Sequence, residues 1–95
     1  MPQRIIGIEW DAGNWPKCGK HGVSKDEIEA LLRGDPMILP DRVGQLAEVR
    51  FNAVGRVGDR YVFLVFTVRE RPAGHYFRPI SARYMHAKEV KHYEG

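Results

Sequence analysis

A lysine and a histidine stand side by side at Lys20 and His21, just before a segment with the pattern of a capped helix. Histidine can exchange a proton near neutral pH, lysine can hold a phosphate, and a helix N-terminus attracts anions. The pair therefore indicates acid–base chemistry at a phosphate. The alternative is structural, with His21 bonded to the backbone and fixing the loop before the helix.

Further candidates lie at Glu48, Arg50 and Arg83. Glu48 and Arg50 are two residues apart in an alternating stretch, so they share one strand face and suit a general base and a phosphate clamp. A surface ion pair is the alternative. Arg83 lies where the last strand should meet the last helix, and its guanidinium can grip a phosphate bidentately. Trp10 is either a base-stacking residue or a core residue.

These groups together could cleave a phosphodiester bond in RNA. A base removes the proton of the 2′-hydroxyl, which attacks the adjacent phosphorus; cations stabilise the non-bridging oxygens and an acid protonates the leaving 5′-oxygen. Because RNA supplies the nucleophile, we expect neither a metal nor a cofactor. The sequence also has no phosphate-binding glycine loop, no paired zinc-ligand spacing, and no catalytic-thiol signature around Cys18.

Positive charge gathers in the C-terminal third of a chain whose formal net charge is +3. From residue 69 to residue 91 the cations are Arg69, Arg71, Arg78, Arg83, Lys88 and Lys91, against Glu70 and Glu89 only. Such clustering says more about a nucleic-acid partner than the total charge does. We expect Arg69, Arg78 and Lys88 to contact RNA, the alternative being a solvated surface.

The composition is that of a soluble globular protein, with 43% hydrophobic and 28% charged residues, so disorder is not expected. A chain of 95 residues predicts one domain, residues 1–95. The single cysteine cannot form an internal disulfide, which fits a reducing cytoplasm. We find neither a membrane-spanning stretch nor a secretory signal, and expect a cytoplasmic protein without membrane contact.

Local patterns place the elements that must position these side chains. Ser24 and Glu27 have capping-box spacing and begin a helix over residues 24–33, which Gly34 ends. A loop with one helical turn occupies residues 11–22, and a final helix runs from residue 84 or 85 to about 93. Strands are expected at residues 4–10, 37–39, 47–54, 61–68 and 75–82, with turns at 55–59 and 70–74.

Hairpin-length connections between the later strands imply an antiparallel sheet. We therefore expect an α+β fold: an antiparallel sheet of about four strands, one or two N-terminal helices and a short C-terminal helix, with the helices on one side. The run at residues 61–68 is expected to be a central strand covered on both faces.

Three motifs occur in order along the chain: Ile8-Glu9-Trp10-Asp11, Lys20-His21-Gly22-Val23, and Arg78-Pro79-Ile80-Ser81-Ala82-Arg83, the last followed by Glu89 and Tyr93-Glu94. Together they resemble the BrnT family of type II toxins, from about Ile8 to Glu94. The chain departs from the family pattern at Lys17, where an asparagine is usual.

The resemblance implies a RelE-like fold, ribonuclease activity and neutralisation by a BrnA-type antitoxin. It also implies that DNA is bound only indirectly, through the antitoxin in the complex, and we expect a homodimer within that complex. The leading hypothesis is a metal-independent endoribonuclease in which Glu48 or His21 is the base and Lys20, Arg50 and Arg83 stabilise the phosphate. Its rivals are a catalytically inactive RNA- or antitoxin-binding module and a subunit that only holds an antitoxin segment.

Overall fold

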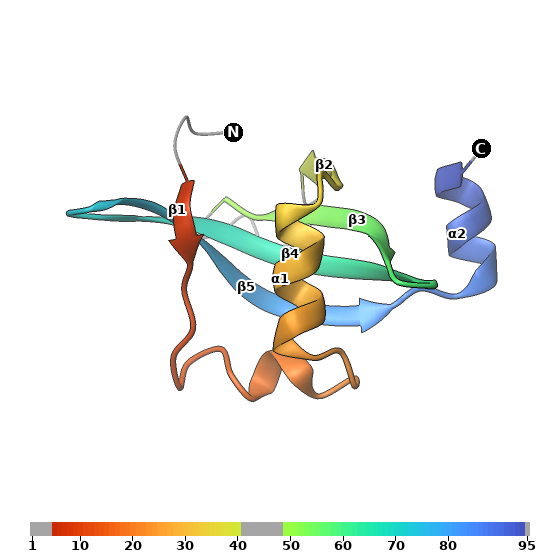
Figure 1. Ribbon diagram of the computed structural model, residues 1–95, viewed down its shortest axis with the longest axis horizontal. Helices are drawn as coiled ribbons and strands as arrows, with labels where there is room; N and C mark the ends of the chain where they lie inside the picture. The colour runs from red at the N-terminus through yellow and green to blue at the C-terminus, as the bar shows by residue number, and fades with distance from the viewer. Residues whose placement is uncertain (1–4, 41–48, 95) are drawn as a thin grey trace.

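Five strands form one mixed sheet in the order β1-β5-β4-β3-β2, and helix α1 lies across one face of it (Figure 1). The computed structural model describes residues 5–40 and 49–94. Its elements are β1 (Ile5–Ile8), the 3-10 turn η1 (Lys17–Gly19), α1 (Lys25–Arg33), β2 (Met37–Pro40), β3 (Phe51–Val57), β4 (Arg60–Arg71), β5 (Gly74–Tyr84) and α2 (Ala87–Glu94). We call the sheet face opposite α1 the open face.

The α+β class is confirmed, but the prediction of an antiparallel sheet of about four strands is wrong. The first strand, β1, pairs in parallel with the last strand, β5, and the sheet has five strands. Connection length could not reveal this pairing, because a loop and α1 separate β1 from the strands that follow. The helices also do not share one side: α2 stands past the end of β5 (Figure 1).

Helix α1 forms as the sequence predicts. The Ser24 hydroxyl accepts the Glu27 N–H at 3.1 Å, and the Glu27 carboxylate accepts the Ser24 N–H at 2.9 Å, which completes the capping box. Its apolar stripe is buried against the sheet through Ile28, Leu31 and Leu32. The helix therefore has a fixed start and a fixed face.

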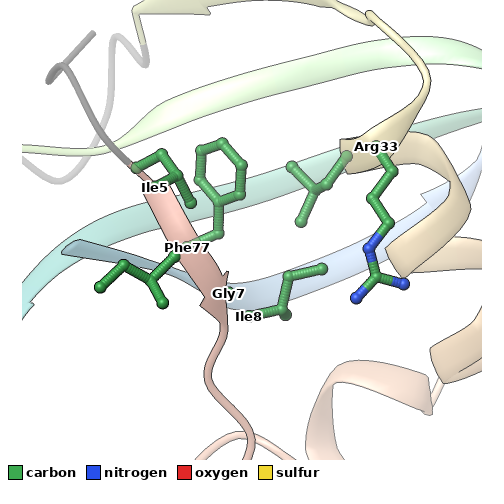
Figure 2. A pocket seen from close by; sticks show the side chains of 7 residues that line it. Ile5, Gly7, Ile8, Arg33 and Phe77 are labelled. Atoms are coloured by element: carbon green, nitrogen blue, oxygen red, sulfur yellow. The ribbon is translucent and has the colours of Figure 1, made fainter. Parts of the chain in front are cut away.

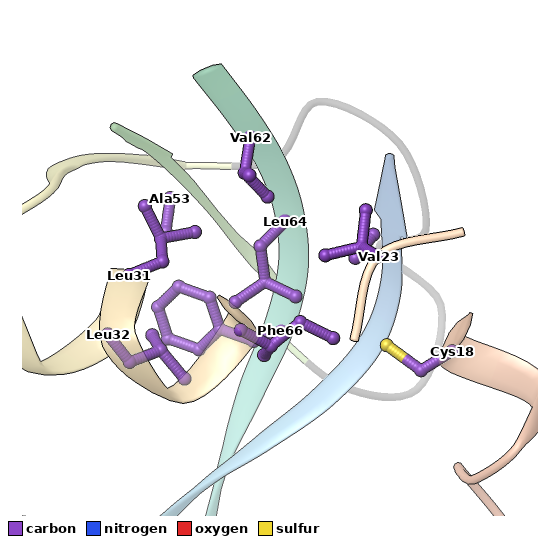
Figure 3. Packing of buried hydrophobic residues seen from close by; sticks show 10 residues of the cluster. Cys18, Val23, Leu31, Leu32, Ala53, Val62, Leu64 and Phe66 are labelled. Atoms are coloured by element: carbon purple, nitrogen blue, oxygen red, sulfur yellow. The ribbon is translucent and has the colours of Figure 1, made fainter. Parts of the chain in front are cut away.

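The core lies between α1 and the sheet (Figure 3). Alternate residues of β4, Val62, Leu64 and Phe66, are buried there, whereas Phe63 between them is only half-buried on the open face. The expectation that this strand is covered on both faces holds only near Thr67, whose side chain lies on the open face and is 2% exposed. The turn predicted at residues 55–59 is also shorter, because β3 continues to Val57 and β4 begins at Arg60. Gly55 packs closely under α1, since a Cβ there would lie 2.8 Å from the Leu31 side chain.

A one-residue irregularity in β5 decides which side chains reach the open face. Val65 pairs with Ser81 and Phe66 with Pro79, so Ile80 is an extra residue, a β-bulge. Without it, strand alternation from Ala82 would turn Arg78 toward α1. With it, Pro79 is buried and Arg78 projects on the open face.

No helix in the described ranges, 5–40 and 49–94, is long and apolar enough to cross a membrane.

Candidate functional site

A pocket of about 200 Å³ opens where the loop of residues 11–22 meets β5. Four cations line it: Lys17 of η1, Arg50 just before β3, Arg69 of β4 and Arg78 of β5. We call these four residues and the space between them the basic pocket. Its other lining residues are Gly13, Asn14, Pro79 and Ile80, and none of the described lining residues is acidic. Three predicted site residues, Arg50, Arg69 and Arg78, thus come together from distant parts of the sequence.

Asn14 fixes the loop that forms one wall of the basic pocket. It is 3% exposed, and its amide donates to the carbonyl oxygens of Glu9 and Pro79, both at 3.0 Å. Its side-chain oxygen accepts the N–H of Asp11 at 2.8 Å. One buried side chain therefore joins the end of β1, the loop and the bulged part of β5. Sequence reasoning missed this residue, since a loop asparagine carries no signal of its burial.

Two carboxylates orient Arg78. Its guanidinium donates to both oxygens of Asp11, at 2.8 and 3.0 Å, and to Glu9 at 3.0 Å. The hydrogen bonds from Arg78 lower the pKa of Asp11 to about 2. Arg78 is thus held rigidly with its charge partly compensated.

Lys17 and Arg50 differ from Arg78 in this respect. No carboxylate of the described residues lies within ion-pairing distance of either side chain. Within residues 5–40 and 49–94, no carboxylate thus competes with an incoming anion for either side chain. In the sequence, Lys17 stood out only because it departs from the family pattern, and it was not predicted as a site residue.

Lys20 and His21 are exposed in the loop before α1, away from the lining of the basic pocket. The loop is tied to the end of β5 by Tyr84, whose hydroxyl donates to Glu27 at 2.8 Å and lies 3.4 Å from the Gly22 carbonyl. The hydrogen bond to Glu27 raises the pKa of Tyr84. Neither Glu27 nor Tyr84 was predicted as part of a site.

Contrary to expectation, Arg83 does not converge with Lys20 and His21. It follows Ala82, which is buried under α1, and alternation along the strand turns its side chain to the open face. There it forms a bidentate ion pair with Glu89 of α2, with both N–O distances 2.8 Å, and its ζ carbon lies 4.8 Å from the Phe63 ring centre. Arg83 therefore anchors α2.

A second pocket, of about 190 Å³, lies between β1 and α1 (Figure 2). Isoleucines of β1, Leu32 and Phe77 line it, and its one described cation, Arg33, is 3.2 Å from Glu29. Mostly apolar walls with a single paired cation do not suit a phosphate. Between the two, the basic pocket is the better site for an anion.

A family model for BrnT, the ribonuclease toxin of type II toxin–antitoxin systems, matches residues 10–89. The chain belongs to the BrnT family. The predicted resemblance is thereby confirmed, and with it come ribonuclease toxin function, an RNA target and an antitoxin partner. The match spans all four cations of the basic pocket. A search of curated proteins found no match.

In this BrnT chain, Trp10 lies in a packed cluster between the loop and α1. Its indole N–H donates to Glu29 at 2.8 Å, its ring meets Trp15 edge to face at 5.4 Å, and the Lys25 ammonium lies 5.4 Å from its ring centre. These contacts favour a structural role over base stacking. Lys88 is exposed on α2, outside the basic pocket, and Glu48 lies outside the described residues.

Cys18 is 1% exposed in the core, and burial raises the pKa of its thiol to about 11. A thiol in this state is a poor nucleophile, as the sequence indicated. The described part of the BrnT chain holds no group of three or more His, Cys, Asp or Glu residues placed to bind a metal ion.

Proposed function

We propose that this BrnT chain is a metal-independent endoribonuclease that holds a phosphate of its RNA substrate in the basic pocket. The observation that carries the proposal is the pocket itself, where Lys17, Arg50, Arg69 and Arg78 converge without a described acidic residue in the lining. Converging cations fixed by the fold stabilise negative charge that develops on a phosphate without reorganising during the reaction.

In the reaction we infer, the 2′-hydroxyl of one nucleotide loses its proton to a base and attacks its own 3′-phosphorus. The new O2′–P bond forms as the P–O5′ bond breaks, which leaves a 2′,3′-cyclic phosphate and a 5′-hydroxyl that takes up a proton. Arg50 and Arg69 bear the charge of the non-bridging oxygens, and Arg78, held by Glu9 and Asp11, shapes the wall.

We assign the base to Glu48 ahead of His21. Glu48 precedes Arg50 by two residues, whereas His21 belongs to the loop segment tied to Tyr84 and not to the pocket lining. Lys20 then contacts the RNA backbone beside the reacting phosphate. Arg83 can contact the RNA backbone only if a phosphate replaces the Glu89 carboxylate as its partner.

The direct test is to incubate the purified chain, without antitoxin, with RNA in EDTA. Cleavage is expected, and Arg50→Gln and Arg69→Gln should each lower its rate about 100-fold, the typical effect of removing one group that stabilises transition-state charge. Glu48→Gln should do the same. Arg56→Gln, on the exposed part of the β3–β4 hairpin, is the matched control and should keep the full rate. Intact RNA with a folded protein would refute the proposal.

Membership in a type II family supports a further part of the proposal, the identity of the partner. We infer that the partner is a BrnA-type antitoxin, which neutralises the toxin and provides the DNA-binding element of the complex. We also infer a RelE-like fold, a homodimer within the complex and a cytoplasmic location. Co-expression with such an antitoxin should abolish cleavage, and the toxin alone should not bind operator DNA.

A catalytically inactive RNA- or antitoxin-binding module is the second candidate. The observation in its favour is that Arg83 is engaged by Glu89 and projects on the open face, away from the loop that carries His21. This candidate predicts a gel shift with RNA that depends on Arg50 but no cleavage at any pH.

A further inference from the structure

A groove of about 440 Å³ lies between the end of the β3–β4 hairpin and α2. The hairpin contributes Asp59, Arg60 and Tyr61, and the other wall includes Met85, Val90 and Lys91. Thr67, the partner of Arg78 in β4, is seven residues from Arg60, so about 20 Å of strand separates the groove from the basic pocket. The groove is therefore a distinct site.

Arg60 joins this groove to a fixed aromatic ring. Its ζ carbon lies 3.5 Å from the centre of the Tyr84 ring, and no described carboxylate forms an ion pair with it. The Tyr84 hydroxyl is in turn held by Glu27 at 2.8 and 2.9 Å. An exposed guanidinium is thus stacked on an immobilised ring, with its N–H donors available.

The loop that borders the basic pocket also reaches this ring. Asn14 donates to the Pro79 carbonyl near the start of the part of β5 that β1 does not pair with, and the Gly22 carbonyl accepts from the Tyr84 hydroxyl at the end of that part. Lys17, Lys20 and His21 lie along the loop between these two attachments. The two lysines therefore place positive charge along the loop between the basic pocket and the Tyr84 ring.

We propose that Arg60, stacked on Tyr84, and the adjoining groove bind a nucleobase of the RNA strand whose phosphate occupies the basic pocket. Splayed bases in single-stranded RNA stack on guanidinium planes and aromatic rings. Met85 and Val90 offer an apolar wall to a base, Lys91 a cation for its phosphate, and Asp59 an acceptor for an exocyclic amine. This inference rests on the proposed function, since it places a base subsite on the same substrate.

The experiment uses the full chain and oligonucleotides made uncleavable by 2′-O-methyl groups, each with one abasic residue at a successive position. One abasic position should weaken binding by the wild type about tenfold, as expected for loss of one stacked base. Arg60→Lys keeps the charge but loses the plane, so it should weaken binding to the intact oligonucleotide about tenfold and remove the effect of that abasic position. Arg56→Lys, the matched control in the same hairpin, should behave as wild type.

Other results would overturn the inference. Arg60→Lys binding with wild-type affinity and wild-type abasic sensitivity would show that only charge matters at this position. A loss of antitoxin affinity with RNA binding unchanged would assign the groove to the protein partner instead. Arg50→Gln separates the two proposals: it should weaken binding to every oligonucleotide and leave the abasic effect in place. Failure of Arg50→Gln to weaken RNA binding would count against the basic pocket and not against the groove.

Discussion

At the scale of single residues, Asn14 shows how a buried polar side chain can shape a surface site. All three of its hydrogen bonds go to backbone groups, two of them donated by its amide. Because these groups belong to Glu9 just after β1, to the loop and to β5, the asparagine sets the position of the loop from which Lys17 enters the basic pocket. Its contribution to RNA binding is therefore indirect.

Asn14→Asp tests this role. The carboxylate cannot donate to the Glu9 and Pro79 carbonyl oxygens and would face them with negative charge, so the free energy of unfolding should fall by about 3 kcal/mol. Urea denaturation measures the loss. RNA affinity should also fall in the fraction that remains folded, and Lys17→Gln should then add little to it. An unchanged urea midpoint would mean that the loop is held by other contacts.

At the scale of elements, the ion pair between Arg83 and Glu89 ties α2 to the sheet. Glu89 accepts two hydrogen bonds from Arg83 and also the N–H of His86 at 2.9 Å, at the start of the helix. The hydrogen bonds from Arg83 lower the pKa of Glu89 to about 2 from its ordinary value of 4.5. The attachment is therefore sensitive to acid.

The sign of the pH effect follows from the lowered pKa. Glu89 stabilises the folded state fully above about pH 4.5, and this stabilisation is lost as the pH falls from 4.5 toward 2. Glu89→Gln should therefore lower the thermal midpoint at pH 7 by an amount that shrinks steadily below pH 4.5. Glu70→Gln, at an exposed site on β4 with no ion pair among the described residues, is the control. A Glu89→Gln difference that stays constant down to pH 2 would rule out the ion pair as its source.

At the scale of the whole molecule, the sheet places cationic side chains at two separate sites. β4 and β5 run from the basic pocket, near Arg69 and Arg78, to the groove beside Arg60, so cations lie at both ends of the same two strands. A single RNA strand that contacts both ends would displace several counterions. Its binding should weaken steeply with salt.

The salt dependence gives a measure of the contacts that each cation makes. For single-stranded nucleic acid, the slope of log affinity against log salt is about −0.7 for each phosphate neutralised. Arg50→Gln should therefore make the slope shallower by about 0.7, and Arg56→Gln should leave it unchanged. Fluorescence anisotropy with a labelled, uncleavable oligonucleotide from 50 to about 200 mM salt measures both. Equal slopes for Arg50→Gln and the wild type would remove Arg50 from the phosphate contacts.

Local patterns in the sequence were sufficient for the elements. The Ser24–Glu27 capping box and Gly34 predicted α1 at both ends, and the β-branched and aromatic run at residues 61–68 predicted β4, because caps and strand propensity depend on residues close in the chain. Ordered motifs were sufficient for the family. The prediction was less accurate at the ends of strands: the strand expected at residues 47–54 begins only at Phe51, and Val49 before it is 70% exposed.

Only the tertiary structure decided which of the candidate residues meet. The parallel pairing of β1 with β5 and the single extra residue at Ile80 bring Arg78 to the face where Arg50 and Arg69 lie, and Asn14 brings Lys17 to the same place. The same alternation separates Arg83 from His21. Strand pairing and a bulge depend on packing between segments far apart in the chain, such as the 65 residues between Asn14 and Pro79, and no periodicity within either segment encodes them.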